Sequence, residues 1–172
     1  RETMGHRFHV KEPISIKEAE KYAEQIEKEG KIVASFEERK NKMVGELKSA
    51  AEKLNAEIIM PDDLVNEVAA LTEWPVVYES GFDEEFLTVP AECLILTMQQ
   101  NQKYFALRDK NKKLMNRFLL VSQIEAKDGG EAIRSGNARV VRARLADAKF
   151  FYDQDRLQTL EARVPGLAHV VY

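Results

Sequence analysis

An amphipathic segment in the first third of the chain places the strongest constraint on the fold. Apolar residues recur three or four positions apart in the sequence EERKNKMVGELKSAAEKLNA, which follows Phe36, at Met43, Leu47, Ala50, Ala51 and Leu54. Charged residues occupy positions between them. This spacing is typical of a helix with one apolar face, and such a face has to pack against another part of the protein.

Other segments predict further helices and strands. We expect helices over 16–29 with Gly30 just past the end, from Pro61 to the residue before Pro75, over 90–98, and beyond Gly129-Gly130 with a break at Pro165-Gly166. Strands are expected at 5–10, 31–35, 76–78, 86–89, 103–107 and 117–123. The FLLV run in the last of these strands suggests burial on both faces.

These elements together predict an α+β fold, with mixed helices and a small, mainly antiparallel sheet. We expect an α+β module over residues 1–125 and a helical segment over residues 126–172 that leads towards a further domain downstream. The two parts are expected to form one compact unit.

Composition narrows the class of protein. Of the 172 residues, 44% are apolar and 32% are charged, which is the balance of a soluble globular protein. No stretch approaches the roughly 18 consecutive apolar residues that cross a bilayer. The chain opens on Arg1 and not on methionine, with no apolar signal-peptide core. We therefore expect a cytoplasmic piece of a longer protein, with no membrane partner.

Few residues offer metal or catalytic chemistry. The single cysteine, Cys93, cannot form an internal disulfide and is expected as a buried apolar group. His6 and His9 flank the Arg7-Phe8 pair and are expected as a pair of surface imidazoles, so no metal site is predicted. The sequence contains no GxGxxG, GxxxxGK[ST], HExxH or GxSxG motif. No catalytic residue is therefore predicted.

Charge is distributed unevenly along the chain. Residues 103–149 hold 12 Lys and Arg against 5 Asp and Glu, a net charge of +7, whereas the remainder carries −10 and the whole chain −3. A mildly acidic protein with one basic third can bind a polyanion locally. The candidates for contacts with phosphate groups are Arg134, Arg139, Arg142 and Lys149, followed by Lys103, Lys112 and Lys113.

The basic helix also has a structural interpretation. In the stretch GNARVVRARLADAKFFYDQDR, residues 136–156, helical spacing places Val141, Leu145, Ala148 and Tyr152 on a core stripe. Arg144 lies three residues before Asp147, so a structural ion pair is expected there. At least two of Phe150, Phe151 and Tyr152 should be core. The remaining cations could form a solvated or intersubunit face as well as one that binds nucleic acid.

Six sequence motifs together resemble the beta subunit of bacterial heterotetrameric glycyl-tRNA synthetases. In order along the chain they are GHRF (5–8), EERK (37–40), LVNEVAALTEWPVVY (64–78), FDEEFLTVPAECLILTM (82–98), QKYF (102–105) and GNARVVRARLADAKFFYDQDR (136–156). The resemblance covers nearly the whole chain. Within it, the Trp74 side chain is expected to be structural, filling the seam between a helix and the strand after Pro75.

The resemblance implies an α2β2 enzyme that joins glycine to its transfer RNA, tRNA(Gly), with ATP and Mg²⁺. In that family the alpha subunit carries the class II catalytic site, and the beta subunit handles much of the RNA and the assembly. The fragment would be a non-catalytic part of the N-terminal half of beta, inactive alone, without a cofactor, and ending near the family's HD-like helical domain. Its expected role is to bind the tRNA backbone and the alpha subunit.

Two alternatives remain open at this point. The N-terminal region of the family also resembles, more distantly, the B3/B4 module of phenylalanyl-tRNA synthetase, which implies a B3/B4-like fold and an editing hydrolase. Glycine is the smallest amino acid, however, and a synthetic pocket can exclude larger ones by size, so editing is less needed. The second alternative is a purely structural scaffold whose basic helix lies against an acidic partner subunit.

Overall fold

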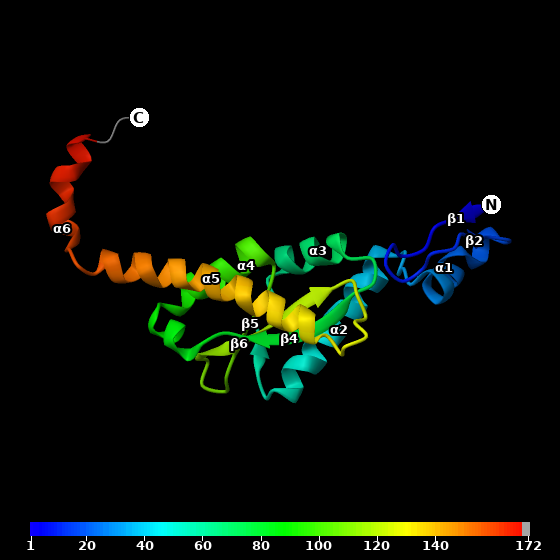
Figure 1. Cartoon of the computed structure of the whole chain (residues 1–172), viewed down its shortest axis with the longest axis horizontal. Coiled ribbons are helices and arrows are strands. Elements are labelled where there is room, and N and C mark those ends of the chain that lie inside the picture. The colour runs from blue at the N-terminus through cyan, green and yellow to red at the C-terminus, as the bar shows by residue number, and fades with distance from the viewer. Residues whose placement is uncertain (170–172) are drawn as a thin grey trace.

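A four-stranded antiparallel sheet forms the centre of the protein (Figure 1). The structure is a computed structural model that describes residues 1–169. The strand order is β3-β5-β6-β4, where β3 is Glu57–Ile58, β4 is Val76–Gly81, β5 is Phe105–Arg108 and β6 is Leu114–Ser122. All three neighbouring pairs are antiparallel. With the helices described below, this confirms the predicted α+β class.

Helices cover both faces of this sheet. On one face α2 (Phe36–Lys53) and α3 (Asp62–Leu71) pack against Phe105, Leu107 and Leu119. On the other, α4 (Ala91–Gln102) and α5 (Glu131–Asp155) pack against Ala106, Phe118 and Leu120. Neighbouring residues of β6 enter opposite cores because side chains alternate along a strand. The predicted burial of the FLLV run on both faces is therefore confirmed.

The predicted amphipathic helix is α2. Its apolar stripe is buried at Met43, Leu47 and Ala51. The helix begins where the Ser35 hydroxyl accepts a hydrogen bond from the Glu38 amide at 3.3 Å, a usual way to satisfy a free N–H of the first turn. It ends before Asn55, whose φ of 52° lies in the left-handed region. The predicted helix after Pro61 and the strand at 76–78 are confirmed as α3 and β4.

The N-terminal 35 residues form a small unit beside this body. It contains β1 (Glu2–Thr3), β2 (Ile14–Ser15), the 3-10 turn η1 (Ala19–Lys21) and α1 (Tyr22–Gly30). Two predicted strands are wrong here. Residues 5–10 form a turn, in which the amides of His9 and Val10 donate to the His6 carbonyl, and residues 31–35 form a loop.

The N-terminal turn approaches the last residue of α1 closely. Gly30 is the last helical residue, and Lys31 after it takes the left-handed φ of 54°, so the predicted position of Gly30 past the helix is wrong. The Gly30 carbonyl accepts the His6 amide at 2.7 Å. A Cβ on Gly5 would lie 2.9 Å from the Gly30 Cα. Glycine is needed at this contact for space and not as the left-handed cap.

Two further predictions about secondary structure are wrong. The predicted strand at 86–89 is the 3-10 helix η2 (Glu84–Thr88), whose amides bond to carbonyls three residues back. The predicted break at Pro165-Gly166 lies at 156–159 instead, between α5 and α6 (Leu160–Arg163). Pro165 and Gly166 belong to the 3-10 segment η3 (Val164–His169).

Three predictions of burial are also wrong. Cys93 is exposed, because α4 turns Leu94 and Met98 to the core instead. His6 is only 2% exposed, because the N-terminal turn folds over it. Phe150 and Phe151 are 59% and 64% exposed, because α5 continues beyond its buried contacts at Val141 and Leu145.

Candidate nucleic-acid interface

The helix α5, which carries most of the predicted basic residues, is held firmly at its N-terminal half. Its first turn is capped by the Asp128 carboxylate, which accepts from the amides of Gly130 and Ala132, both at 2.9 Å. These bonds hold the pKa of Asp128 below its usual range. The Ser80 hydroxyl on β4 donates to the Arg134 carbonyl at 3.0 Å. The orientation of the helix against the sheet is thereby fixed.

A second anchor lies one turn further along the helix. The Tyr104 hydroxyl donates to the Asn137 side-chain oxygen, and the Asn137 amide donates to the Ile133 carbonyl at 2.7 Å. Burial raises the pKa of Tyr104 to about 12, so this hydroxyl keeps its proton and remains a donor. The predicted core stripe is confirmed, since Val141 and Leu145 are buried and Ala148 and Tyr152 are partly buried.

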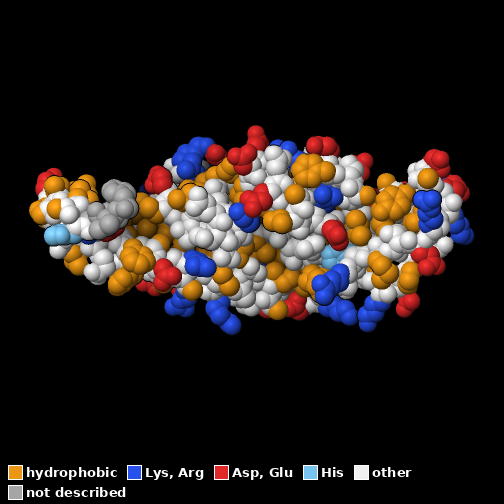
Figure 2. Space-filling model, turned by 90° about the horizontal axis from the view of Figure 1, so that it is seen from above, with side chains coloured by type: hydrophobic (Ala, Val, Ile, Leu, Met, Phe, Trp, Pro, Cys, Tyr) orange, Lys and Arg blue, Asp and Glu red, His pale blue; other side chains and the backbone are white. Residues whose placement is uncertain are grey.

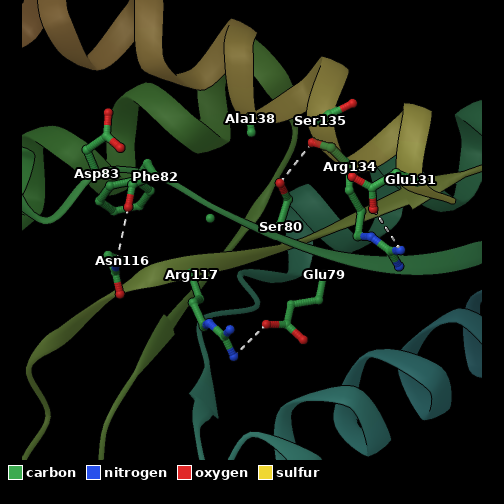
Figure 3. Close-up of a pocket in the computed structure, with 11 residues that line it drawn as sticks. Glu79, Ser80, Phe82, Asp83, Asn116, Arg117, Glu131, Arg134, Ser135 and Ala138 are labelled. Carbon is green, nitrogen blue, oxygen red and sulfur yellow. Dashed lines mark hydrogen bonds and ion pairs between the residues drawn. The ribbon is translucent and has the colours of Figure 1, made fainter.

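A groove of about 650 Å³ runs between the first turns of α5 and the strands β4 and β6 (Figure 3). Charged side chains line it as pairs. Arg117 on β6 lies 2.8 Å from Glu79 on β4, and Arg134 lies 3.4 Å from Glu131 within α5. At the end of the groove away from Arg134, the Asn116 side chain donates to the Phe82 carbonyl at 3.1 Å.

Arg139 and Arg142 line an adjoining hollow of about 260 Å³, together with Gly81, Phe82, Asp83 and Ala138. The Nε atom of Arg142 lies 3.3 Å from a carboxylate oxygen of Asp83, and both side chains are at least half exposed. Arg139 is exposed, and within residues 1–169 it takes part in no ion pair. The two arginines therefore present cationic groups beside one concave surface.

The other predicted cations do not join this surface. Lys149 lies one helical turn from Asp153 and pairs with it at 2.7 Å. Lys103, at the end of α4, pairs with Glu67 of α3 at 2.9 Å. Lys112, in the β5–β6 turn, pairs with Glu57 of β3. Lys113 follows Lys112 in the same turn, and neither residue lines the α5 groove or the adjoining hollow.

The basic third of the chain is thus partly neutralised by its own acids. Of the seven predicted cations, Arg139 and Lys113 are the two without an ion pair in the part of the chain that the structure describes. Figure 2 shows blue and red side chains interspersed over the face it displays. Exposed pairs of this kind are worth only about 0–1 kcal/mol, so an incoming phosphate can compete for their cations.

The side chains predicted to be structural have different surroundings. Arg144 and Asp147 are both exposed, and the ion pairs of residues 1–169 include none between them. The ammonium groups of two lysines lie near the Trp74 ring, with Lys42 Nζ 3.6 Å and Lys31 Nζ 4.7 Å from the ring centroid. Its indole N–H donates to Glu125 at 2.8 Å. Trp74 therefore joins the N-terminal unit, α2 and the loop after β6.

Sequence reasoning missed several residues of the groove. Glu79, Ser80, Asp83, Asn116 and Arg117 come from β4, β6 and the loop after β4. Gly81 pairs with Arg117 in the sheet register, which brings the two strands together here. No local pattern in the sequence predicts that pairing. The ion pairs between acidic side chains and these arginines could not be predicted for the same reason.

The charged lining does not fit a metal ion. Glu79, Asp83 and Glu131 are each paired with a different arginine and are not gathered around one point. Across residues 1–169 no cluster of three or more His, Cys, Asp or Glu side chains could hold a metal. The lining of the groove and the hollow also includes neither His nor Cys.

Within residues 1–169, no helix has the length and apolar character needed to cross a membrane.

Comparison with known proteins identifies a family whose match covers the whole chain. The family described as glycyl-tRNA synthetase beta subunit matches residues 1–172. The chain belongs to this family. The resemblance of the six motifs is therefore confirmed.

Individual relatives agree with this assignment. The glycine–tRNA ligase beta subunit of Neisseria meningitidis serogroup C (strain 053442) is 57% identical over 171 residues, which cover 99% of this chain and 25% of the relative. The beta subunits of Leptothrix cholodnii and Thiobacillus denitrificans are each 53% identical over 173 residues, covering all of this chain and 24% of those relatives. The chain thus spans about a quarter of the length of the beta subunits that it matches.

Proposed function

We propose that these residues are a non-catalytic part of a glycyl-tRNA synthetase beta subunit, in an α2β2 enzyme that joins glycine to tRNA(Gly) with ATP and Mg²⁺. The parts of the enzyme outside these residues would bind ATP and Mg²⁺ and carry out the chemistry, and the fragment alone would be inactive. Membership of the beta-subunit family supports the proposal.

Within that enzyme, we propose that α5 contacts the tRNA backbone through Arg134, Arg139, Arg142 and Lys149. The observation that carries this proposal is the hollow beside Arg139 and Arg142, where two guanidinium groups flank one concave surface. Arginine suits phosphate because its planar group can donate two parallel hydrogen bonds. Contacts of this kind position an RNA without reading its sequence. Lys103, Lys112 and Lys113 lie on other elements and would contribute less.

The test is binding of the full-length beta subunit, assembled with alpha, to tRNA(Gly) across a series of salt concentrations. The triple variant Arg139→Ala, Arg142→Ala, Lys149→Ala removes the proposed contacts. Each lost phosphate contact should lower the salt slope by about one, so we expect a decrease of about three. Binding to non-cognate tRNA should weaken in the same proportion.

A matched control removes three positive charges elsewhere. Lys48, Lys110 and Lys127 lie outside α5, are exposed and take part in no ion pair of residues 1–169. Their replacement by alanine lowers the net charge equally but should change the salt slope much less. Equal effects of the two triple variants would mean that net charge, and not the α5 surface, governs binding.

The ion pairs favour a second candidate for the same surface. Arg142 already binds a carboxylate of Asp83, and Lys149 one of Asp153, so α5 could equally hold the acidic surface of a partner subunit. The triple variant would then fail to assemble with alpha, and its tRNA binding per assembled enzyme would be unchanged. No contact in the groove favours the editing alternative or tests the B3/B4-like fold, which both remain predictions from the resemblance.

A further inference from the structure

The C-terminal arm, residues 153–169, lies outside the packed body of the protein. All of its side chains are exposed, and Figure 1 shows it projecting away from the sheet beyond the end of α5. Large apolar side chains are among them: Leu157 is 73% exposed, Leu160 81%, Val164 60% and Leu167 67%. Phe150 and Phe151, at the base of the arm, form an edge-to-face pair with centroids 5.5 Å apart.

We call these six residues the arm surface: Phe150, Phe151, Leu157, Leu160, Val164 and Leu167. In Figure 2 hydrophobic side chains gather at the end of the molecule where the arm lies. Large apolar side chains that gather on the surface of a soluble protein often mark a site of interaction.

The arm has a defined local structure. The Thr159 hydroxyl accepts the Ala162 amide at 3.3 Å and caps α6. Arg163 on α6 pairs with Asp155 at the end of α5 at 3.1 Å, which ties the two helices across their break. Side chains four apart in an α-helix and three apart in a 3-10 helix lie on the same side. Leu160, Val164 and Leu167 have these spacings along α6 and η3 and so share one side of the arm.

The charge of the arm indicates the chemistry of its partner. Residues 153–169 hold two arginines against three acidic residues, a net charge of −1. A surface that binds RNA is strongly basic, so this arm is unsuited to that partner. Leucine, valine and phenylalanine side chains with few charges are typical of the core of a contact between protein parts.

We infer that the arm surface packs against a part of the same beta subunit outside these 172 residues. About three-quarters of the length of each matched relative lies outside the region that this chain covers. A covalently linked part has a high effective concentration at the arm, about millimolar for a short linker, and therefore outcompetes a separate molecule. This inference rests on the family assignment and is independent of the proposed tRNA contacts.

The test is hydrogen exchange on the full-length beta subunit by itself, without alpha or tRNA. Peptides covering 157–169 should exchange at least about tenfold more slowly than an unprotected segment, and equally slowly after a tenfold dilution. Rapid exchange under all conditions would overturn the inference. Protection that appears only with alpha would assign the arm to the subunit interface, and protection lost on dilution would assign it to a second beta copy. Either result would also overturn the inference.

Paired variants make the test specific. Leu160→Asp with Leu167→Asp places two charges on the arm surface and should remove the protection of 157–169. Gln158→Asp with Ala162→Asp adds the same charge at exposed positions outside the arm surface and should leave protection intact. Peptides from β6 serve as an internal reference, since its buried residues should stay protected in every variant. Persistent protection in the leucine double variant would contradict the inference.

Discussion

The Tyr78 ring on β4 lies directly against the Cα of Gly130, so that a Cβ at Gly130 would be 2.2 Å from the ring carbon Cε1. Gly130 precedes α5 with a φ of 88°, in the left-handed region. The Tyr78 hydroxyl donates to the Ile124 carbonyl at 2.8 Å and accepts the Ala126 amide at 3.1 Å. One tyrosine thus holds the whole loop from β6 to α5.

Replacing Gly130 with alanine should be strongly destabilising. The left-handed conformation costs a residue with a Cβ about 1–2 kcal/mol, and the displaced Tyr78 ring adds to this. We expect a decrease of at least about 2 kcal/mol in the free energy of unfolding, measured by chemical denaturation. Gly136 within α5 is the control, because nothing lies within 4 Å of its Cβ position. Gly136→Ala should stabilise the protein by about 0.5–1 kcal/mol, and equal effects at both sites would refute the argument.

The Tyr78 hydroxyl can be tested separately from the ring. Tyr78→Phe keeps the packing against Gly130 but leaves the Ile124 carbonyl and the Ala126 amide without their partner. We expect a loss of about 1 kcal/mol in the free energy of unfolding. Faster hydrogen exchange should be confined to residues 123–130. Tyr22→Phe, at a tyrosine 41% exposed, should change stability little, and a comparable loss there would contradict the assignment.

Elements whose buried faces follow from the spacing of their own apolar residues could be predicted from the sequence. The periodicity of α2 and the apolar run of β6 each specify which faces are buried, and both were predicted correctly. The segment 86–89 was predicted as a strand because its apolar residues resemble one. Phe86 and Val89 are indeed buried, at 3% exposure each, but through 3-10 backbone bonds that the pattern does not distinguish from a strand.

The candidate site was predictable only on its helical side. Helical spacing placed Arg139 and Arg142 together, and both line the same hollow. Asp83, the partner of Arg142, follows β4, and the pairing of β4 with β6 depends on contacts distant in sequence. The exposure of Phe151 was mispredicted for a similar reason. Hydrophobicity favours burial, but the body of this chain supplies no surface there to cover the ring.

Trp74 offers a test of how the N-terminal unit is attached. Trp74→Phe removes the hydrogen bond to Glu125 and weakens the contacts with Lys31 and Lys42. That bond is the main reason why the pKa of Glu125 lies below its usual range, so the pKa should rise towards the ordinary value in an NMR titration. The free energy of unfolding should fall by about 1 kcal/mol. An unchanged Glu125 pKa would show that the bond does not form in solution.

Two of the lysines of α2 provide a matched pair for the same contact. Lys42 lies 3.6 Å from the Trp74 centroid, whereas Lys48 is exposed on the same helix and takes part in no ion pair of residues 1–169. Lys42→Ala should cost about 0.5–1 kcal/mol of unfolding free energy, and Lys48→Ala should cost close to nothing. Equal losses would mean that helix propensity, and not the contact with the ring, is responsible.

The buried His6 should make the N-terminal unit sensitive to pH. Burial, and then the nearby His9 ring at 4.8 Å, lower the pKa of His6, while Glu73 and Gln123 oppose this. A lowered histidine pKa means that the unfolded state binds the proton first. Stability is therefore complete above the unfolded value of about 6.5 and is lost as the pH falls from there towards the folded pKa.

Hydrogen exchange of residues 5–15 should accordingly become faster between pH 7 and pH 5, after correction for the intrinsic dependence of exchange on pH. His6→Leu should remove this acceleration, because the site then has no group to protonate. His169→Gln, at an exposed histidine, should retain it. An NMR titration that places the His6 pKa above 6.5 would reverse the sign of the linkage, since protonation would then stabilise the N-terminal unit instead of loosening it.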